Sequence, residues 1–294
     1  MPFALVCLVA IVAMGTARAA DRYWPPIVDP PTHTWNPGRW IWADLVTSDV
    51  AAAAEFYGKV FGWTYETYGG DNDLDTYTLV LADKLPIGGM VFDARAMKGK
   101  VPSARWIAFV SVDDVARAAS SVSSHGGKVV LAPKHLGERG DTAIFQDPEG
   151  TLFGAIHAAS GDPPNYLADD NEWMWIDLWT SDVARATEFY RAVAGYEQVM
   201  PITDDGGGHS GAYLLAGGYA RAGVMQKLRP GNSAAWIAYV RVADVRAAAE
   251  RARKAGGRVL IEPTTLRRAV VALIADPTGA PIGIAQLDRA GTPQ

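Results

Sequence analysis

The stretch "WIWADLVTSDV" (residues 40–50) is repeated almost unchanged as "WMWIDLWTSDV" (residues 173–183). The copies lie 133 positions apart (173 minus 40), and "EFY" follows each copy at the same distance. Later phrases return in the same order: "SARWIAFVSVDDVARAA" from Ser103 reappears as "SAAWIAYVRVADVRAAA" from Ser233, and "QDPEG" reappears as "ADPTG". A unit of about 120 residues is therefore present twice.

Each unit divides again into two halves that share one pattern. In the first half, alternating apolar residues predict a strand over 40–47, Asp49 predicts the start of a helix and Gly62 its end. Three short strands are expected next, around 64–68, 77–81 and 88–92. The half that begins near Arg105 repeats this order. The sequence thus predicts an α+β fold with four βαβββ modules.

These modules resemble the vicinal oxygen chelate superfamily in their D-V-x-x-A-x-x-F-Y-x-x-x-x-G-W/Y helix and their late D-P-x-G turn. That superfamily includes glyoxalase I, extradiol dioxygenases, fosfomycin-resistance enzymes and bleomycin-resistance proteins. The resemblance implies two domains, 39–158 and 172–288, each a cup-shaped mixed sheet with its helices outside. It implies little about function, because this fold carries many chemistries.

The first nineteen residues differ from the rest of the chain. A short apolar run ends in "ARA" at 17–19, which predicts a signal peptide (1–19) cleaved before Ala20. The protein is then expected in the periplasm or outside the cell, with no stable membrane anchor after cleavage. The remaining segments are interpreted as a Pro-rich linker, an interdomain linker and a tail, at 20–38, 159–171 and 289–294.

Composition excludes several classes of protein. The net charge is −5, and no run of Lys or Arg marks a nucleic-acid partner. Cys7 is the only cysteine and lies inside the predicted signal peptide. A cysteine nucleophile, thiolate ligand or redox pair is therefore not expected in the mature chain.

The resemblance also implies where metal ligands would lie. Metal-dependent members carry His or Gln seven residues before the helix-capping Asp, and Glu about seven residues after the Asp of D-P-x-G. Here those positions hold Trp42, Trp106, Trp175, Trp236, Gly154 and Gly283. Indoles and glycines offer no donor to zinc, iron or manganese, so neither a metal nor a cofactor is expected. The five histidines are not expected to bind a metal. His33 is expected in the N-terminal linker, His125 at a helix end, His135 and His209 in loops, and His157 at the end of a strand, pointing away from the cup.

Strand alternation puts Trp42 and Asp44 on one face, and likewise Trp175 and Asp177. If that face lines the cup, the expected ligand-binding residues are Trp42, Asp44, Trp106, Trp175, Asp177 and Trp236. The favoured hypothesis is a small planar or cationic molecule bound between indoles and a carboxylate. Two alternatives stay open. One is a cofactorless lyase, isomerase or hydrolase with Asp44 or Asp177 as its base, and the other is a structural or partner-binding relic with filled cups.

Overall fold

The computed structural model describes residues 24–69, 76–93, 104–202, 210–227, 233–266 and 269–287. The predicted signal peptide, its cleavage site before Ala20, the tail at 289–294 and His209 lie outside this part of the chain. Within the described ranges, no helix is long and apolar enough to cross a membrane.

The first half of the chain forms one eight-stranded mixed sheet in the order β2-β3-β4-β1-β5-β8-β7-β6. The two opening strands of its modules lie side by side at the centre. They run antiparallel to each other, and each pairs in parallel with the last strand of its own module. The strands are β1 (Trp40–Thr47), β2 (Thr64–Gly69), β3 (Thr76–Ala82), β4 (Leu85–Phe92), β5 (Arg105–Ser111), β6 (Lys128–His135), β7 (Gly140–Gln146) and β8 (Leu152–Ala158).

The second half repeats this sheet in the order β10-β11-β12-β9-β13-β16-β15-β14. The same pairings recur between the corresponding strands. These strands are β9 (Trp173–Thr180), β10 (Gln198–Ile202), β11 (Gly211–Ala216), β12 (Tyr219–Gln226), β13 (Ala235–Arg241), β14 (Arg258–Leu266), β15 (Ala269–Ala275) and β16 (Pro281–Leu287).

One helix follows the opening strand of each module: α2 (Val50–Phe61), α3 (Val115–Ser124), α4 (Val183–Ala194) and α5 (Val245–Lys254). Each begins after an aspartate whose side chain accepts a hydrogen bond from a backbone N–H of the first turn. Those N-caps are Asp49, Asp114, Asp182 and Asp244. The predicted α+β fold of four βαβββ modules in two domains is confirmed.

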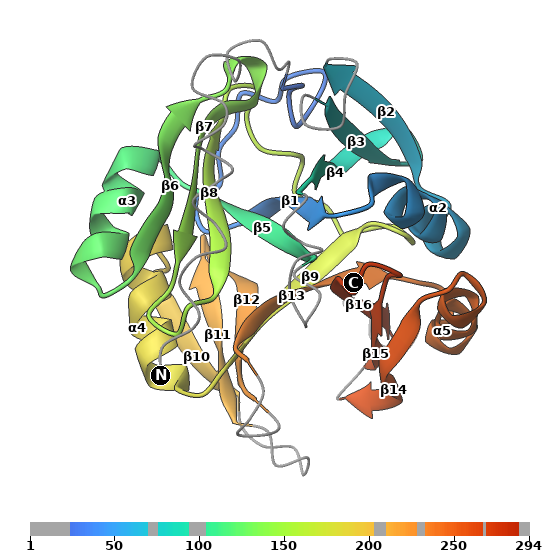
Figure 1. Ribbon diagram of the computed structural model, residues 1–294. Coiled ribbons are helices and arrows are strands. Elements are labelled where there is room, and N and C mark those ends of the chain that lie inside the picture. The colour runs from blue at the N-terminus through green and yellow to red at the C-terminus, as the bar shows by residue number, and fades with distance from the viewer. Residues whose placement is uncertain are drawn as a thin grey trace, which may run out of the picture.

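The two domains meet through their helical faces. In Figure 1 the sheets lie one above the other, with α3 beside α4 on the left and α2 beside α5 on the right. Two apolar cores run across this junction: one joins Phe56 of α2 to Ile284 of β16, and the other joins Phe153 of β8 to Phe189 of α4. Each domain therefore buries its helices partly against the other domain, and the inner faces of the sheets point away from the junction.

Candidate functional site

On the inner face of the first sheet, hydrogen bonds join the side chains of Trp42, Asp44 and Tyr77. Trp42 Nε1 donates to Asp44 Oδ1 (2.8 Å), and the Tyr77 hydroxyl donates to the same oxygen (2.7 Å). All three side chains are buried. Gly89 lies opposite Asp44 on β4, and a Cβ at that position would be 1.9 Å from the Tyr77 hydroxyl oxygen. A glycine is therefore required where Tyr77 reaches over to Asp44.

Arg139 lies at the centre of this first cup, at the end of a short 3₁₀ helix (Gly137–Arg139), and is only 2% exposed. Its Nη1 lies 3.9 Å from Asp44 Oδ2. Its Cζ is 4.6 Å from the ring centroid of Trp42 and 4.9 Å from that of Tyr77. Burial raises the pKa of the Tyr77 hydroxyl and Asp44 raises it further, while Arg139 lowers it. The tyrosine is therefore a protonated donor at neutral pH.

The chain itself fills the first cup with residues that the sequence predicted to be a linker. The Trp24 ring lies 4.9 Å from the Tyr77 ring, and Ile27 is 1% exposed. The backbone carbonyl of Pro25 accepts a hydrogen bond from Arg139 Nε (2.9 Å). Asp44, one of the two candidate bases, is only 8% exposed in this filled cup.

The second cup repeats the central pair but leaves it more open. Trp175 Nε1 donates to Asp177 Oδ1 (2.7 Å), and a Cβ at Gly223 would lie 2.1 Å from that oxygen. Trp175 and Asp177 are only partly buried, whereas their counterparts Trp42 and Asp44 are 3% and 8% exposed. The same pair of tryptophan and aspartate is thus buried in the first domain and partly exposed in the second.

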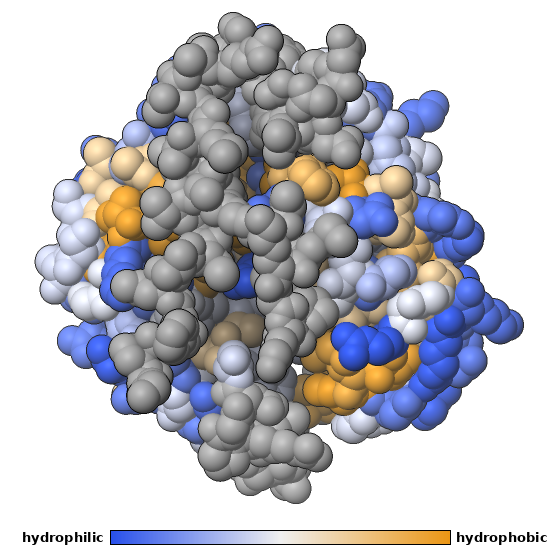
Figure 2. Space-filling model, viewed as in Figure 1, coloured by the Kyte–Doolittle hydropathy of each residue, from blue (hydrophilic) through white to orange (hydrophobic). Residues whose placement is uncertain are grey.

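Aromatic and aliphatic side chains surround the Asp177 carboxylate. The Tyr213 ring meets the Trp175 ring edge to face at 5.9 Å. Burial raises the pKa of the Tyr239 hydroxyl, and its hydrogen bond to Asp177 raises it further. The other apolar side chains of this cluster are buried Ile237 and Ala285 and partly exposed Met174, Trp179, Ala235, Val271 and Leu273. Figure 2 shows an orange, hydrophobic area over β15 and β16.

The prediction that Trp106 and Trp236 line the cups is wrong. The helices of these modules are capped by Asp114 and Asp244. The prediction for Trp106 had taken the preceding residue, Asp113, as the cap of the second module's helix. Seven residues before those caps stand Ile107 and Ile237, which face the cups. Because side chains alternate along a strand, a shift of one residue puts both tryptophans on the opposite, helix-covered face.

On that face the two tryptophans stabilise the junction between the domains. Trp106 Nε1 donates to the Tyr57 hydroxyl (2.9 Å), which donates to Asp276 Oδ2 in the other domain (3.1 Å). The second domain repeats these two hydrogen bonds. Trp236 Nε1 donates to the Tyr190 hydroxyl (2.8 Å), which donates to Asp147 Oδ2 in the first domain (3.1 Å). Burial raises the pKa of both tyrosines, so they remain protonated donors.

The aspartates of this junction belong to the two D-P-x-G turns. The sequence analysis used these turns as markers of the fold and of the expected ligand positions, and it missed this role. Asp147 accepts the tyrosine hydroxyl at Oδ2, and its Oδ1 accepts the backbone N–H groups of Glu149 (2.9 Å) and Thr151 (2.8 Å). The recurrence of Tyr and Asp in both halves was the available signal, but nothing local links residues so far apart in the chain.

The family models match both domains. Residues 26–154 match the Glyoxalase/Bleomycin resistance protein/Dioxygenase superfamily, and residues 173–285 match the Glyoxalase-like domain. The chain belongs to this superfamily, with two of its domains in tandem. The resemblance inferred from the sequence is thereby confirmed.

The chain is similar to two relatives over most of their length. The chain is 29% identical to "Putative glyoxylase CFP32" of Mycobacterium bovis, over 81% of this chain and 91% of that protein. It is 28% identical to "Anthracycline biosynthesis protein DnrV" of Streptomyces peucetius, over 87% and 96% of the two chains. Among solved structures, the Mn(II)-bound glyoxalase from Novosphingobium aromaticivorans aligns with a TM-score of 0.59 at 16% identity, covering 88% of this chain and 86% of that one. At that identity the likeness concerns the fold alone.

The residues at the superfamily's metal positions do not fit a transition metal. The opening strands present Trp42, Ile107, Trp175 and Ile237 to the cups. At Gly154 and Gly283 a Cβ would lie 2.1 Å from the Phe109 ring and 2.3 Å from the Tyr239 ring. Those two rings therefore occupy the space that a ligand side chain on the last strand would need. In the part of the chain that the structure describes, no group of three His, Cys, Asp or Glu residues could hold a metal ion.

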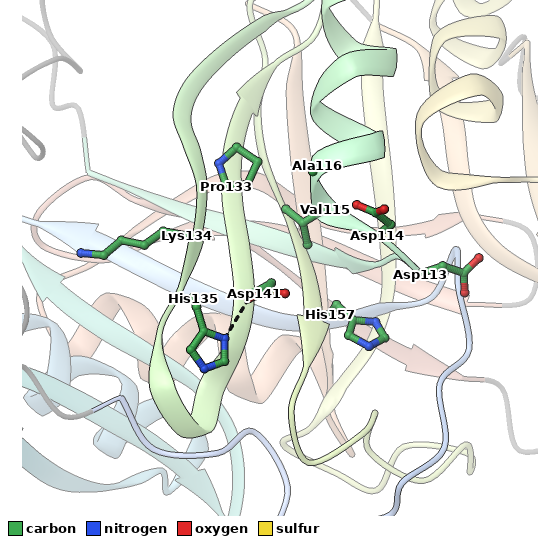
Figure 3. Close-up of a pocket in the computed structure, with 9 residues that line it drawn as sticks. All are labelled: Asp113, Asp114, Val115, Ala116, Pro133, Lys134, His135, Asp141 and His157. Carbon is green, nitrogen blue, oxygen red and sulfur yellow. Dashed lines mark hydrogen bonds and ion pairs between the residues drawn. The ribbon is translucent and has the colours of Figure 1, made fainter.

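A hollow of about 410 Å³ lies outside both cups, between the start of α3 and strands β6 to β8 (Figure 3). His135 Nδ1 lies 2.8 Å from Asp141 Oδ1 on one side of it, and Asp113 points outward on the other side. His157 donates from Nδ1 to the backbone carbonyl of Val112 (3.0 Å), on the face away from the cup, as its position in the strand predicted. These polar groups do not converge on one point, so the hollow offers no coherent site.

Proposed function

We propose that this protein binds a small planar molecule in its second cup, without a transition metal. The observation that carries the proposal is the partly exposed pair of Trp175 and Asp177, whose counterparts in the first cup are buried. An indole and a carboxylate that remain accessible together give a ligand one stacking surface and one anchoring acceptor.

The chemistry of the cup limits the class of ligand. Its lining is aromatic and aliphatic, with Trp175, Trp179 and Tyr213 offering ring faces or edges. The polar group at its centre is the Asp177 carboxylate, which would accept hydrogen bonds from a ligand or attract a cationic group. A planar ring system that carries an amino or hydroxyl donor satisfies both features.

One relative supports this class of ligand. The protein DnrV, which covers 87% of this chain, is named for anthracycline biosynthesis. Anthracyclines are planar fused-ring compounds that carry hydroxyl groups and an amino sugar. They therefore combine the flat surface and the donors that the second cup would recognise.

We also propose that the protein is exported. Cleavage before Ala20 would leave Trp24, Pro25 and Ile27 in the mature chain. The segment that fills the first cup would thus be retained after processing.

A titration that detects the ligand tests the proposed function. The fluorescence of an anthracycline is followed as the mature protein is added, with and without a chelator. We expect saturable binding that the chelator leaves unchanged and that Trp175→Ala weakens at least about tenfold, a loss of about 1.4 kcal/mol. Tyr166→Ala, an aromatic residue 50% exposed in the interdomain linker, is the control and should bind like the unaltered protein.

Two outcomes would overturn the proposal. One is equal affinity in the Trp175→Ala and unaltered proteins, because the ligand would then be bound elsewhere. The other is loss of binding on addition of chelator with the fold intact, because a metal would then be part of the site.

A further inference from the structure

The buried guanidinium of Arg139 has one edge that its surroundings satisfy only in part. Nε donates to the Pro25 carbonyl (2.9 Å), and Nη1 lies 3.9 Å from Asp44 Oδ2. Nη2 is buried and has no hydrogen-bond partner within the described residues. A buried donor of a charged group left without an acceptor is unfavourable, so this nitrogen marks a place where a better acceptor would bind.

The geometry of the guanidinium defines that acceptor. Nε and Nη2 lie on the same edge of the planar group and direct parallel N–H bonds outward. Two adjacent oxygens of a carboxylate match this edge with two charge-assisted hydrogen bonds. The Pro25 carbonyl provides one oxygen only, and it therefore satisfies half of the edge.

The side chains around Pro25 indicate the rest of the ligand. Trp24 lies against Tyr77 at 4.9 Å, and Ile27 is almost completely buried in the first cup. The chain therefore supplies a flat ring, an aliphatic group and a carbonyl oxygen. Trp42 and Tyr77 would present the same surfaces to an aromatic ring that replaced these residues.

We propose that the first cup is a binding site for a small aromatic carboxylate, and that residues 24–27 occupy it in competition with that ligand. Asp44 stays on the Nη1 side of the guanidinium, where Trp42 and Tyr77 donate hydrogen bonds to it. The Nε and Nη2 edge is then available when Pro25 moves away. The site goes beyond the proposed function, because it uses the other cup and another chemistry.

The test compares a carboxylate with its neutral amide on the mature protein. The probes are 1-naphthoate and 1-naphthamide, which have the same ring but two oxygens and one oxygen, respectively. Isothermal titration is carried out on the unaltered chain and on Trp24→Ala and Ile27→Ser, which weaken the competing segment. We expect 1-naphthoate to bind both variants at least about tenfold more tightly than it binds the unaltered chain. In the variants, residues 24–27 leave the first cup more often, so a larger fraction of the protein can bind the ligand.

Arg139→Lys tests the recognition of the carboxylate. Lysine keeps the charge but loses the two-pronged edge, so the preference for 1-naphthoate over 1-naphthamide should fall severalfold from about tenfold. Hydrogen exchange gives a second readout, which does not depend on this variant. Backbone amides around Ile27 should exchange faster with saturating 1-naphthoate present and not with 1-naphthamide.

The outcomes separate this site from the second cup. All titrations are repeated with Trp175→Ala, which should leave 1-naphthoate binding unchanged. The proposal is overturned if neither Trp24→Ala nor Ile27→Ser binds 1-naphthoate, or if carboxylate and amide bind those variants equally. It is also overturned if exchange around Ile27 stays the same at saturation, or if Trp175→Ala abolishes binding.

Discussion

The hydroxyl of Tyr57 donates a hydrogen bond to Asp276 Oδ2 at 3.1 Å, although the two residues are 219 positions apart and belong to different domains. The hydroxyl of Tyr190, in the second domain, donates the equivalent hydrogen bond to Asp147 Oδ2 in the first domain, also at 3.1 Å. Both contacts are buried and lie beside apolar cores that both domains share. We infer that the two domains unfold as one unit, since separating them would expose these polar groups and both cores.

Replacing the buried tyrosine tests the importance of this junction. Tyr57→Phe leaves the indole N–H of Trp106 and one oxygen of Asp276 without their partner. We expect a loss of about 1–3 kcal/mol in the free energy of unfolding, measured by urea denaturation. Tyr68→Phe, which removes an exposed hydrogen bond to Glu66, should change stability by less than about 0.5 kcal/mol. Equal losses in both variants would contradict the assigned role.

The two cup aspartates should respond differently to the same substitution. Asp44→Asn removes the carboxylate next to Arg139, whose charge is buried, and we expect a loss of about 1–3 kcal/mol. Asp177→Asn changes a partly exposed group, so we expect less than half of that loss and a weaker response to the planar ligand. Thermal melts of the two variants provide the comparison. A larger destabilisation from Asp177→Asn than from Asp44→Asn would contradict the conclusion that Asp177 is the less buried of the two carboxylates.

Glycines opposite the two aspartates are expected to be irreplaceable. Gly89→Ala would put a methyl group 1.9 Å from the Tyr77 hydroxyl oxygen, and we expect a loss of about 1–3 kcal/mol through displaced side chains. Gly58→Ala is the control, since its Cβ would meet nothing closer than 3.5 Å. Because Gly58 lies within helix α2, alanine there should raise stability by up to about 1 kcal/mol. The prediction fails if both variants shift the melting temperature in the same direction.

Glu149 should make the protein sensitive to acid. Burial raises its pKa, but hydrogen bonds from Ser181 and Thr180 of the second domain outweigh this and lower the pKa to about 2, from an ordinary value of 4.5. A lowered pKa in the folded state stabilises the protein fully above pH 4.5, and the contribution is lost as the pH falls toward 2.

The acid sensitivity is measured by urea unfolding at pH 6 and pH 3. Because Glu149 is exposed in part, we expect the unaltered protein to lose only about 1 kcal/mol more than Glu149→Gln between these two values. Glu188→Gln, on an exposed position of α4, should follow the unaltered protein. Parallel losses in the unaltered protein and Glu149→Gln would exclude the assigned contribution.

The N-terminus of the isolated protein tests the proposed export. If the segment 1–19 is a signal peptide, the protein isolated from its source begins at or near Ala20, as read by N-terminal sequencing. Finding Met1 or Pro2 on the isolated protein would show that the segment is retained and would remove the basis for export.

Local patterns in the sequence were sufficient for the fold. The order of strands and helices follows from apolar alternation, from aspartates at helix starts and from glycines such as Gly62 at helix ends. The duplicated phrase at 40–50 and 173–183 then identified the repeat, and the helix motif and the D-P-x-G turns indicated the superfamily. These features depend on neighbouring residues, so the sequence contains them directly.

The face of the sheet on which each tryptophan lies was predicted correctly only where the strand register was certain. Trp42 and Asp44 were assigned to one face correctly, because Asp49 fixes the start of the following helix. Trp106 was assigned to the wrong face, because two consecutive aspartates, Asp113 and Asp114, each fit the capping position. The hydrogen bond from Arg117 N to Asp114 decides between them, and an error of one residue inverts a strand.

The sequence by itself therefore determined the four modules, their pairing in two tandem domains and the absence of metal donors at the expected positions. Only the tertiary structure decided that residues 24–27 fill one cup, that Trp175 and Asp177 of the other cup are only partly buried, and that Arg139 and the two D-P-x-G turns have partners far away in the chain. The physical reason is the range of the interactions. Strand alternation and helix capping act over a few residues, whereas the contacts between Arg139 and Pro25 or between Tyr57 and Asp276 form only when distant segments pack together.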